Sequence, residues 1–107
     1  MQRVTIVRYA TKPGRADENE ALSRAVFAEL NQKPAQPIAY ALMRNGNEFL
    51  HLFLNLEHDD ADALTELPSF KAFSADGPAR WIAPPEIIRT GMNLVDSYGF
   101  RAALTLA

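Results

Sequence analysis

The feature that most constrains the fold is a hairpin signal near the middle of the chain, Asn45-Gly46-Asn47. Asparagine and glycine are favoured in the tight turns that join two antiparallel strands. The signal separates a strand-like run, 38–44, from a second run, 49–56, that is apolar on both faces. Such a run is typical of a strand in the interior of a sheet. The sequence therefore predicts an antiparallel strand pair whose second member is a central strand.

The hairpin also predicts which side chains share a face of the sheet. If Asn45-Gly46 is the two-residue loop, Arg44 lies opposite Asn47 and Tyr40 lies opposite His51. Side chains alternate between faces along a strand, so a one-residue change of register would place Tyr40 and His51 on opposite faces. The face predicted from this pairing carries four polar side chains: Tyr40, Arg44, His51 and Asn55.

A strand and a helix are predicted before the hairpin. Residues 3–10 are rich in β-branched and aromatic side chains, and they end at the turn sequence Lys12-Pro13-Gly14-Arg15. Asp17 followed three positions later by Glu20 has the spacing of a capping box. A helix is therefore predicted over 17–32.

A broken helical segment and a final strand are predicted after the hairpin. A helix capped by Asp59 or Asp60 runs to Leu67, and Pro68 starts a short helix that Gly77-Pro78 closes. Alternation of apolar residues predicts the last strand over 86–98.

The resulting order is strand, helix, strand, strand, helix, strand. This is the α+β, ferredoxin-like βαββαβ arrangement with an antiparallel sheet. Residues 1–98 are predicted to form a single domain, and residues 99–107 a C-terminal tail that either docks on a partner subunit or is disordered.

Three of these segments together resemble the antibiotic-biosynthesis-monooxygenase-like family of dimeric α+β barrels. They are Lys12-Pro13-Gly14-Arg15 with its acidic helix start, the buried strand 49–56, and Leu67-Pro68-Ser69-Phe70-Lys71-Ala72-Phe73. The resemblance implies a ferredoxin-like protomer whose sheet packs on a second copy, giving a homodimer that forms a dimeric α+β barrel. It also implies a ligand cavity between sheet and helices in each protomer.

The activities that this resemblance implies are cofactor-free oxygenation of polycyclic quinols and degradation of haem. Haem-degrading relatives carry a histidine ligand on the second helix, whereas residues 61–75 contain no histidine. Haem is therefore disfavoured, and no cofactor is expected.

Charge and composition exclude several other classes of function. Eleven Lys and Arg against thirteen Asp and Glu give a formal charge of −2, so nucleic acid is not an expected partner. The chain has no cysteine and hence no thiolate chemistry. The acidic run at 57–62 suits a helix start better than a metal site, and none is predicted. Without an apolar signal segment or a membrane span, a cytoplasmic location is expected.

The candidate catalytic residues are His51, Tyr40, Asn55 and Arg8. An imidazole has its ordinary pKa near 6.5 and could act as a general base on an acidic aromatic hydroxyl, with Tyr40 and Asn55 orienting the substrate. Arg8 could stabilise negative charge on a substrate oxygen or form an ion pair across the dimer. The alternative is that the pairing of His51 and Tyr40 only stabilises the sheet and has no catalytic role.

The candidate ligand-binding residues are Tyr9, Phe49, Phe53 and Trp81, which would line a cavity or simply fill the core. Two functions follow. The first is a cofactor-independent monooxygenase acting on a small aromatic or polycyclic compound. The alternative is a non-catalytic domain for ligand binding or assembly, in which these side chains fill the pocket. A cavity of about 300 Å³ or more would favour the first.

Overall fold

The computed structural model describes residues 2–34, 37–55 and 62–99. Four strands form one antiparallel sheet in the order β2-β3-β1-β4. The elements are β1 (Gln2–Ala10), α1 (Ala16–Gln32), β2 (Ile38–Asn45), β3 (Glu48–Asn55), α2 (Asp62–Thr65), α3 (Pro68–Ala75), α4 (Gly77–Arg80) and β4 (Glu86–Met92). The α+β, ferredoxin-like fold is confirmed, and β3 lies inside the sheet, as its apolar pattern predicts.

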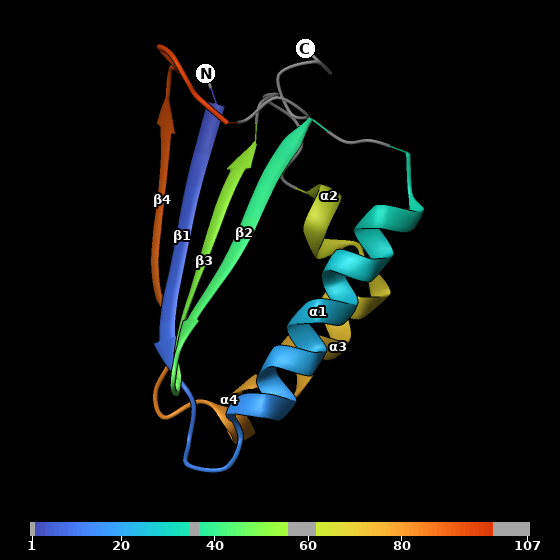
Figure 1. The fold of residues 1–107 in the computed structure, drawn as a ribbon, viewed down its shortest axis with the longest axis vertical. Coiled ribbons are helices and arrows are strands. Elements are labelled where there is room, and N and C mark those ends of the chain that lie inside the picture. The colour runs from blue at the N-terminus through green and yellow to red at the C-terminus, as the bar shows by residue number, and fades with distance from the viewer. Residues whose placement is uncertain (1, 35–36, 56–61, 100–107) are drawn as a thin grey trace.

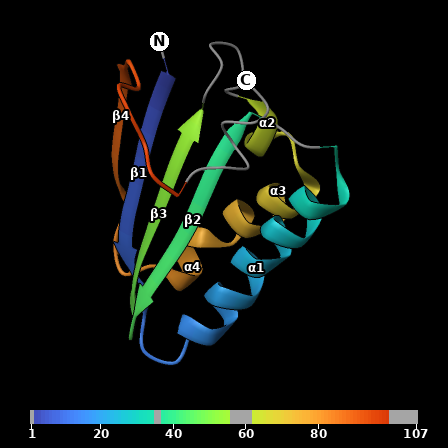
Figure 2. The same ribbon diagram turned by 45° about the horizontal axis from the view of Figure 1, so that its top comes forward.

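All four helices lie on one face of the sheet, with α1 beside α3 (Figures 1 and 2). The core forms between these two layers around Tyr9, Val26, Phe49, Leu67 and Phe73. The opposite face of the sheet is covered by no helix in the described ranges (Figure 1). The two faces therefore have very different surroundings.

The hairpin register differs from the predicted one by two residues. Asn45 pairs with Glu48 and Tyr40 pairs with Phe53, so the loop is Gly46-Asn47 rather than Asn45-Gly46. Gly46 has φ +62°, which suits the first position of a type II′ turn. Because a shift of two residues preserves the alternation, Tyr40 and His51 still share a face.

The first helix begins one residue earlier than predicted and without the predicted capping box. Arg15 occupies the N-cap position, and no side chain caps this end. Asp17 and Glu20 instead accept hydrogen bonds from Arg44 of β2, at 3.0 Å each. These carboxylates therefore connect the helix to the hairpin.

Two predicted boundaries in the second half of the chain are wrong. Gly77-Pro78 starts α4 instead of closing α3, since Gly77 does not have the positive φ of a helix-ending glycine. The last strand ends at Met92 rather than at 98. Met92 pairs with Gln2, the first residue of β1, so β1 offers no further partner among the described residues. The predicted caps Asp59 and Asp60 and the tail beyond Gly99 lie outside the described residues.

Candidate functional site

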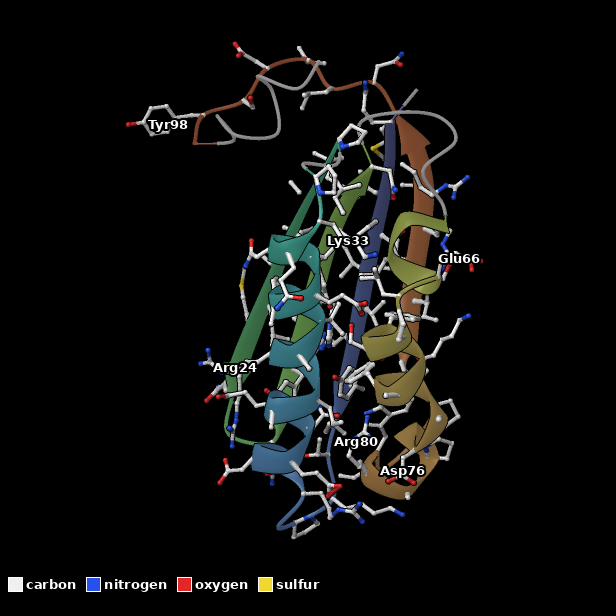
Figure 3. All side chains as sticks on the ribbon, turned by 90° about the vertical axis from the view of Figure 1, so that its right-hand side faces the viewer. Arg24, Lys33, Glu66, Asp76, Arg80 and Tyr98 are labelled. Atoms are coloured by element: carbon white, nitrogen blue, oxygen red, sulfur yellow. The ribbon has the colours of Figure 1, made fainter. Side chains whose placement is uncertain are left out.

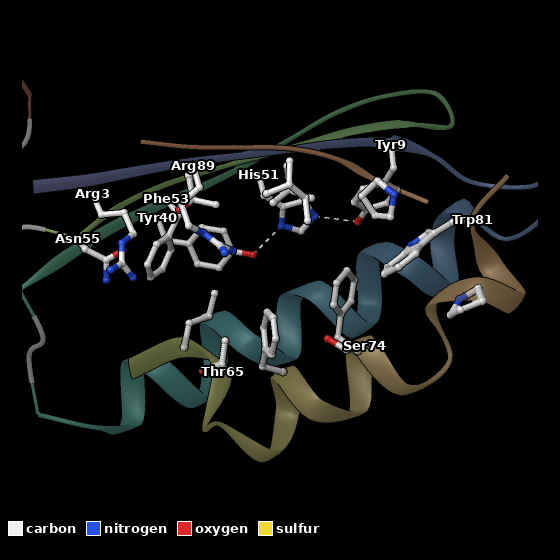
Figure 4. A pocket seen from close by; sticks show the side chains of 18 residues that line it. Arg3, Tyr9, Tyr40, His51, Phe53, Asn55, Thr65, Ser74, Trp81 and Arg89 are labelled. Carbon is white, nitrogen blue, oxygen red and sulfur yellow. Dashed lines mark hydrogen bonds between the residues drawn. The ribbon is translucent and has the colours of Figure 1, made fainter. Parts of the chain in front are cut away.

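A pocket of about 630 Å³ lies between the sheet and the helices. Its walls come from the covered face of β1, β2, β3 and β4 and from the segment that contains α2, α3 and α4 (Figure 4). The aromatic residues that line it are Tyr9, Tyr40, Phe53, Phe70, Phe73 and Trp81. Its volume is in the range of small-molecule sites, and its walls suit a planar apolar ring.

His51 lies in this pocket between two tyrosines (Figure 4). The Tyr40 hydroxyl is 2.6 Å from Nδ1 of His51, and the Tyr9 hydroxyl is 2.8 Å from Nε2. The three side chains come from adjacent strands, because β3 lies between β2 and β1. The predicted contact between Tyr40 and His51 is thus present, but it is diagonal across the strands. From the sequence, Tyr9 was predicted only as part of the aromatic wall.

The hydrogen bonds continue from Tyr9 into the interior through residues that the sequence analysis missed. Asn19 Nδ2 donates to the Tyr9 hydroxyl at 2.8 Å. Asn19 Oδ1 accepts from Arg80 Nε and from Trp81 Nε1, at 3.0 Å each. Arg80 is fully buried between α1 and the α3–α4 segment (Figure 3), and its Nη2 donates to the Phe73 carbonyl at 2.6 Å.

Helix α1 carries the signal that could have identified this polar core. Its buried residues are Ala16, Asn19, Ser23 and Val26. Their spacing of three, four and three places them on one helical face. Polar residues at two of these positions indicate a hydrogen-bonded interior.

Burial controls the protonation of the three central groups. It lowers the pKa of His51 to about 4, so the imidazole is neutral at pH 7. It raises the pKa of Tyr9 to about 12 and raises the pKa of Tyr40 further. The lowered pKa agrees poorly with the predicted general base, because a base with a pKa far below the working pH is a weak proton acceptor. Both tyrosines keep their protons and can donate hydrogen bonds.

One end of the pocket is polar and cationic. Arg3 and Asn55 lie there together on the covered face (Figure 4), and Arg89 also lines the pocket. Arg3 pairs with Asn55 across β1 and β3, and Asn55 is 3% exposed. The predicted residue Asn55 is therefore in the pocket.

Arg8, by contrast, is exposed and points to the opposite face of the sheet from Tyr9 and His51. Alternation along β1 places Arg3 rather than Arg8 in the pocket. The structure thus separates Arg8 from the other three candidate catalytic residues.

Three of the four candidate ligand-binding residues line the pocket: Tyr9, Phe53 and Trp81. Phe49 is 1% exposed and stacks on Tyr9, with 5.6 Å between ring centroids. It packs beside the Tyr9 ring and does not itself line the pocket. Trp81 packs directly on Gly77, where any Cβ would overlap its six-membered ring. The glycine therefore allows the indole to reach the pocket.

Among the described residues, no group of three or more metal-ligating side chains comes together. In the same part of the chain, no helix has the length and apolar character needed to cross a membrane.

The fold and the pocket define a ferredoxin-like α+β protein with an aromatic cavity between its sheet and its helices. No family model and no curated protein matches the chain. The chain is similar in structure to a candidate antibiotic biosynthesis monooxygenase from Chloroflexus aurantiacus, with a TM-score of 0.70 and 18% identity over 92% of this chain and 98% of that one.

Two further solved structures are similar. Rv0793 from Mycobacterium tuberculosis gives a TM-score of 0.75 at 15% identity, over 91% of this chain and 100% of that one. A candidate antibiotic biosynthesis monooxygenase from Caulobacter crescentus gives a TM-score of 0.72 at 18% identity, over 89% of this chain and 91% of that one. The predicted resemblance is confirmed at the level of the fold, which by itself does not assign an activity.

Proposed function

We propose that the protein binds a small hydroxylated aromatic or polycyclic compound in the pocket and oxygenates it without a cofactor. The observation that carries this proposal is the cavity of about 630 Å³, which is lined by aromatic rings and has the hydrogen-bonded residues Tyr40, His51 and Tyr9 in its wall. The similar structures named as monooxygenases support the choice of reaction.

The reaction balances without an external reductant. A phenolic ring and O₂ give a quinone and one water. One oxygen atom forms the new ring carbonyl, and the other leaves in water with the hydroxyl hydrogen and one ring hydrogen. The ring supplies all four electrons, so no flavin or metal is required.

The residues of the pocket would favour the phenolate form of the substrate, which is the form that gives electrons to O₂. Tyr40 can donate a hydrogen bond to its oxygen, while Arg3 and Arg89 contribute positive charge in the pocket wall. Because burial holds the pKa of His51 near 4, the imidazole is a weak acceptor for the substrate proton.

We further propose that the protein acts as a cytoplasmic homodimer. The uncovered face of the sheet carries the large apolar side chains Met43, Ile88 and Met92, which are more than half exposed in the single chain. A second copy packed on this face would bury them. Arg8 lies on this same face and is available for the ion pair predicted across the dimer.

The test is oxygen uptake with a panel of polycyclic phenols, whose quinone products should form as O₂ is consumed. Tyr40→Phe should lower kcat/KM roughly 100-fold by removing one donor to the developing charge. Tyr98→Phe is the matched control, since Tyr98 is 98% exposed and points away from the pocket (Figure 3). Unchanged turnover by His51→Ala would contradict the role of the polar set.

One observation favours a second function, a binding protein without catalysis. The histidine in the pocket is neutral and hydrogen-bonded at both nitrogens, as expected of a group that positions others. In that case the same compounds quench the fluorescence of Trp81, the single tryptophan, without any oxygen uptake.

A further inference from the structure

The hydrogen bonds around His51 have a direction, and the starting point is Asn19. An amide can be placed in two orientations, but here two groups that only donate, Arg80 Nε and Trp81 Nε1, both point at one atom of Asn19. That atom must be the oxygen. The amide nitrogen therefore faces Tyr9 and donates to its hydroxyl.

Tyr9 consequently accepts from Asn19 and must place its own proton elsewhere. His51 Nε2 lies 2.8 Å from the hydroxyl. The competing partner is Ser23, whose hydroxyl also lies within reach of Tyr9 and donates to the backbone carbonyl of Asn19 at 2.8 Å. An imidazole nitrogen is the stronger acceptor, since it is far more basic than a serine hydroxyl. The Tyr9 proton therefore points at Nε2.

A neutral imidazole carries one N–H, so acceptance at Nε2 places the proton of His51 on Nδ1. Nδ1 then donates to the Tyr40 oxygen, 2.6 Å away. Tyr40 is left with a proton that has no acceptor among the described residues and with its hydroxyl in the pocket wall (Figure 4). The chain of donors ends at the position of a ligand.

The first donor in this series of hydrogen bonds is a buried cation. Arg80 is fully buried, lies 5.1 Å from the ring centroid of Phe73, and forms no ion pair within the described part of the protein. Charge-assisted donation to Asn19 polarises the bonds that follow it, because each donor strengthens the next in a low-dielectric interior. Every dipole in the chain points its positive end toward the pocket.

We infer that Arg80, Asn19, Tyr9 and His51 form a one-way hydrogen-bond chain that makes Tyr40 a dedicated donor to a ligand oxygen. The pocket then selects aromatic compounds that present an acceptor there, a carbonyl or a phenolate, over those that present only a donor. His51 is a positioning residue in this scheme. The inference deepens the proposed function and depends on it only for the presence of an aromatic ligand.

The direction of the chain can be tested in the ligand-free protein by ¹⁵N NMR of labelled histidine. We expect the proton of His51 on Nδ1, with the second histidine identified by the variant His58→Gln. A proton on Nε2 would overturn the inference, because Tyr40 would then donate to His51 and could only accept from a ligand. This result does not depend on any enzymatic activity.

The ligand end of the chain can be tested with 4-nitrophenol, whose phenolate is coloured. Optical titration should show the pKa of the bound phenol about one unit below that of the free compound, a tenfold preference for the anion. Tyr40→Phe should abolish this preference, and Tyr98→Phe should retain it. A bound pKa equal to or above the free value in the wild-type protein contradicts the inference. Failure of the probe to bind while the Nδ1 tautomer is present counts against the proposed function alone.

Discussion

The two faces of the sheet are built from the same strands but differ in how closely their side chains are specified. On the covered face, alternate residues of β1 and β3 include Tyr9, Phe49 and His51, all less than 8% exposed and tied to named partners. On the uncovered face, the intervening positions of β3 are leucines that remain partly exposed. The covered face thus requires individual residues, whereas the other requires only apolar character, a difference that can be tested by mutation.

The largest expected effect on stability comes from a substitution in the buried hydrogen-bond network next to the covered face. Asn19→Ala removes the acceptor of two buried donors, and one of these belongs to the charged Arg80. We expect a loss of about 3 kcal/mol or more in the free energy of unfolding, measured by urea denaturation. Asn31→Ala, at an exposed position of the same helix, is the control and should change stability by less than about 0.5 kcal/mol. Equal effects would show that the network contributes little.

A pH dependence should follow from the burial of His51. The folded protein holds its pKa near 4, against about 6.5 in the unfolded chain, so the unfolded chain binds more protons between these values. Stability should therefore fall as the pH is lowered from about 6.5 and level off near pH 4, by about 3 kcal/mol in all. His51→Gln, which does not titrate, should lack this component. An identical pH profile for both proteins would contradict the burial of a neutral imidazole.

The uncovered face should be sensitive to charge and tolerant of apolar change. Ile88→Asp introduces a carboxylate among the exposed apolar side chains of β4. We expect the proposed dimer to weaken at least about tenfold in sedimentation equilibrium, with unchanged circular dichroism. Ile88→Val should remain dimeric. A wild-type protein that sediments as a monomer of 11.9 kDa at micromolar concentration would disprove the homodimer.

The smallest effect is expected at the ion pairs of Arg44, which connect the hairpin to α1 at the edge of the covered face. Arg44 contacts Asp17 and Glu20 at 3.0 Å, and the hydrogen bond that Glu20 accepts from Arg44 holds the pKa of Glu20 below its usual value. All three groups are accessible to solvent, so Arg44→Ala should lower the Tm only slightly. That difference should disappear at roughly 1 M salt, where exposed charges are screened. A loss that persists at high salt would assign Arg44 a packing role.

Most of the architecture could be predicted from local patterns. Periodicity, the turn residues and the element order gave the βαββαβ arrangement and the central position of β3. The errors were local. The hairpin loop is Gly46-Asn47 and not Asn45-Gly46. Both Gly-Asn and Asn-Gly are acceptable two-residue turns, so the sequence alone does not choose between them. The end of β4 depends on the length of its neighbour and not on its own sequence.

The site was predicted only in part, for physical reasons. Alternation was enough to place Tyr40, His51 and Asn55 in one pocket. The roles of Asn19 and Arg80 depend on contacts between residues 61 positions apart in the chain, which no local pattern reports. The pKa of His51 is lowered by burial, which depends on the tertiary structure, so its ordinary value suggested a stronger base than the buried imidazole is.

The most direct test of the account is a crystal structure of the protein with 4-nitrophenol bound. The ring should lie between the sheet and the helices against Phe53 and Trp81, with its oxygen about 2.6–3.2 Å from the Tyr40 hydroxyl. The account would be contradicted if the phenol bound outside this pocket, or within it with its oxygen turned away from Tyr40.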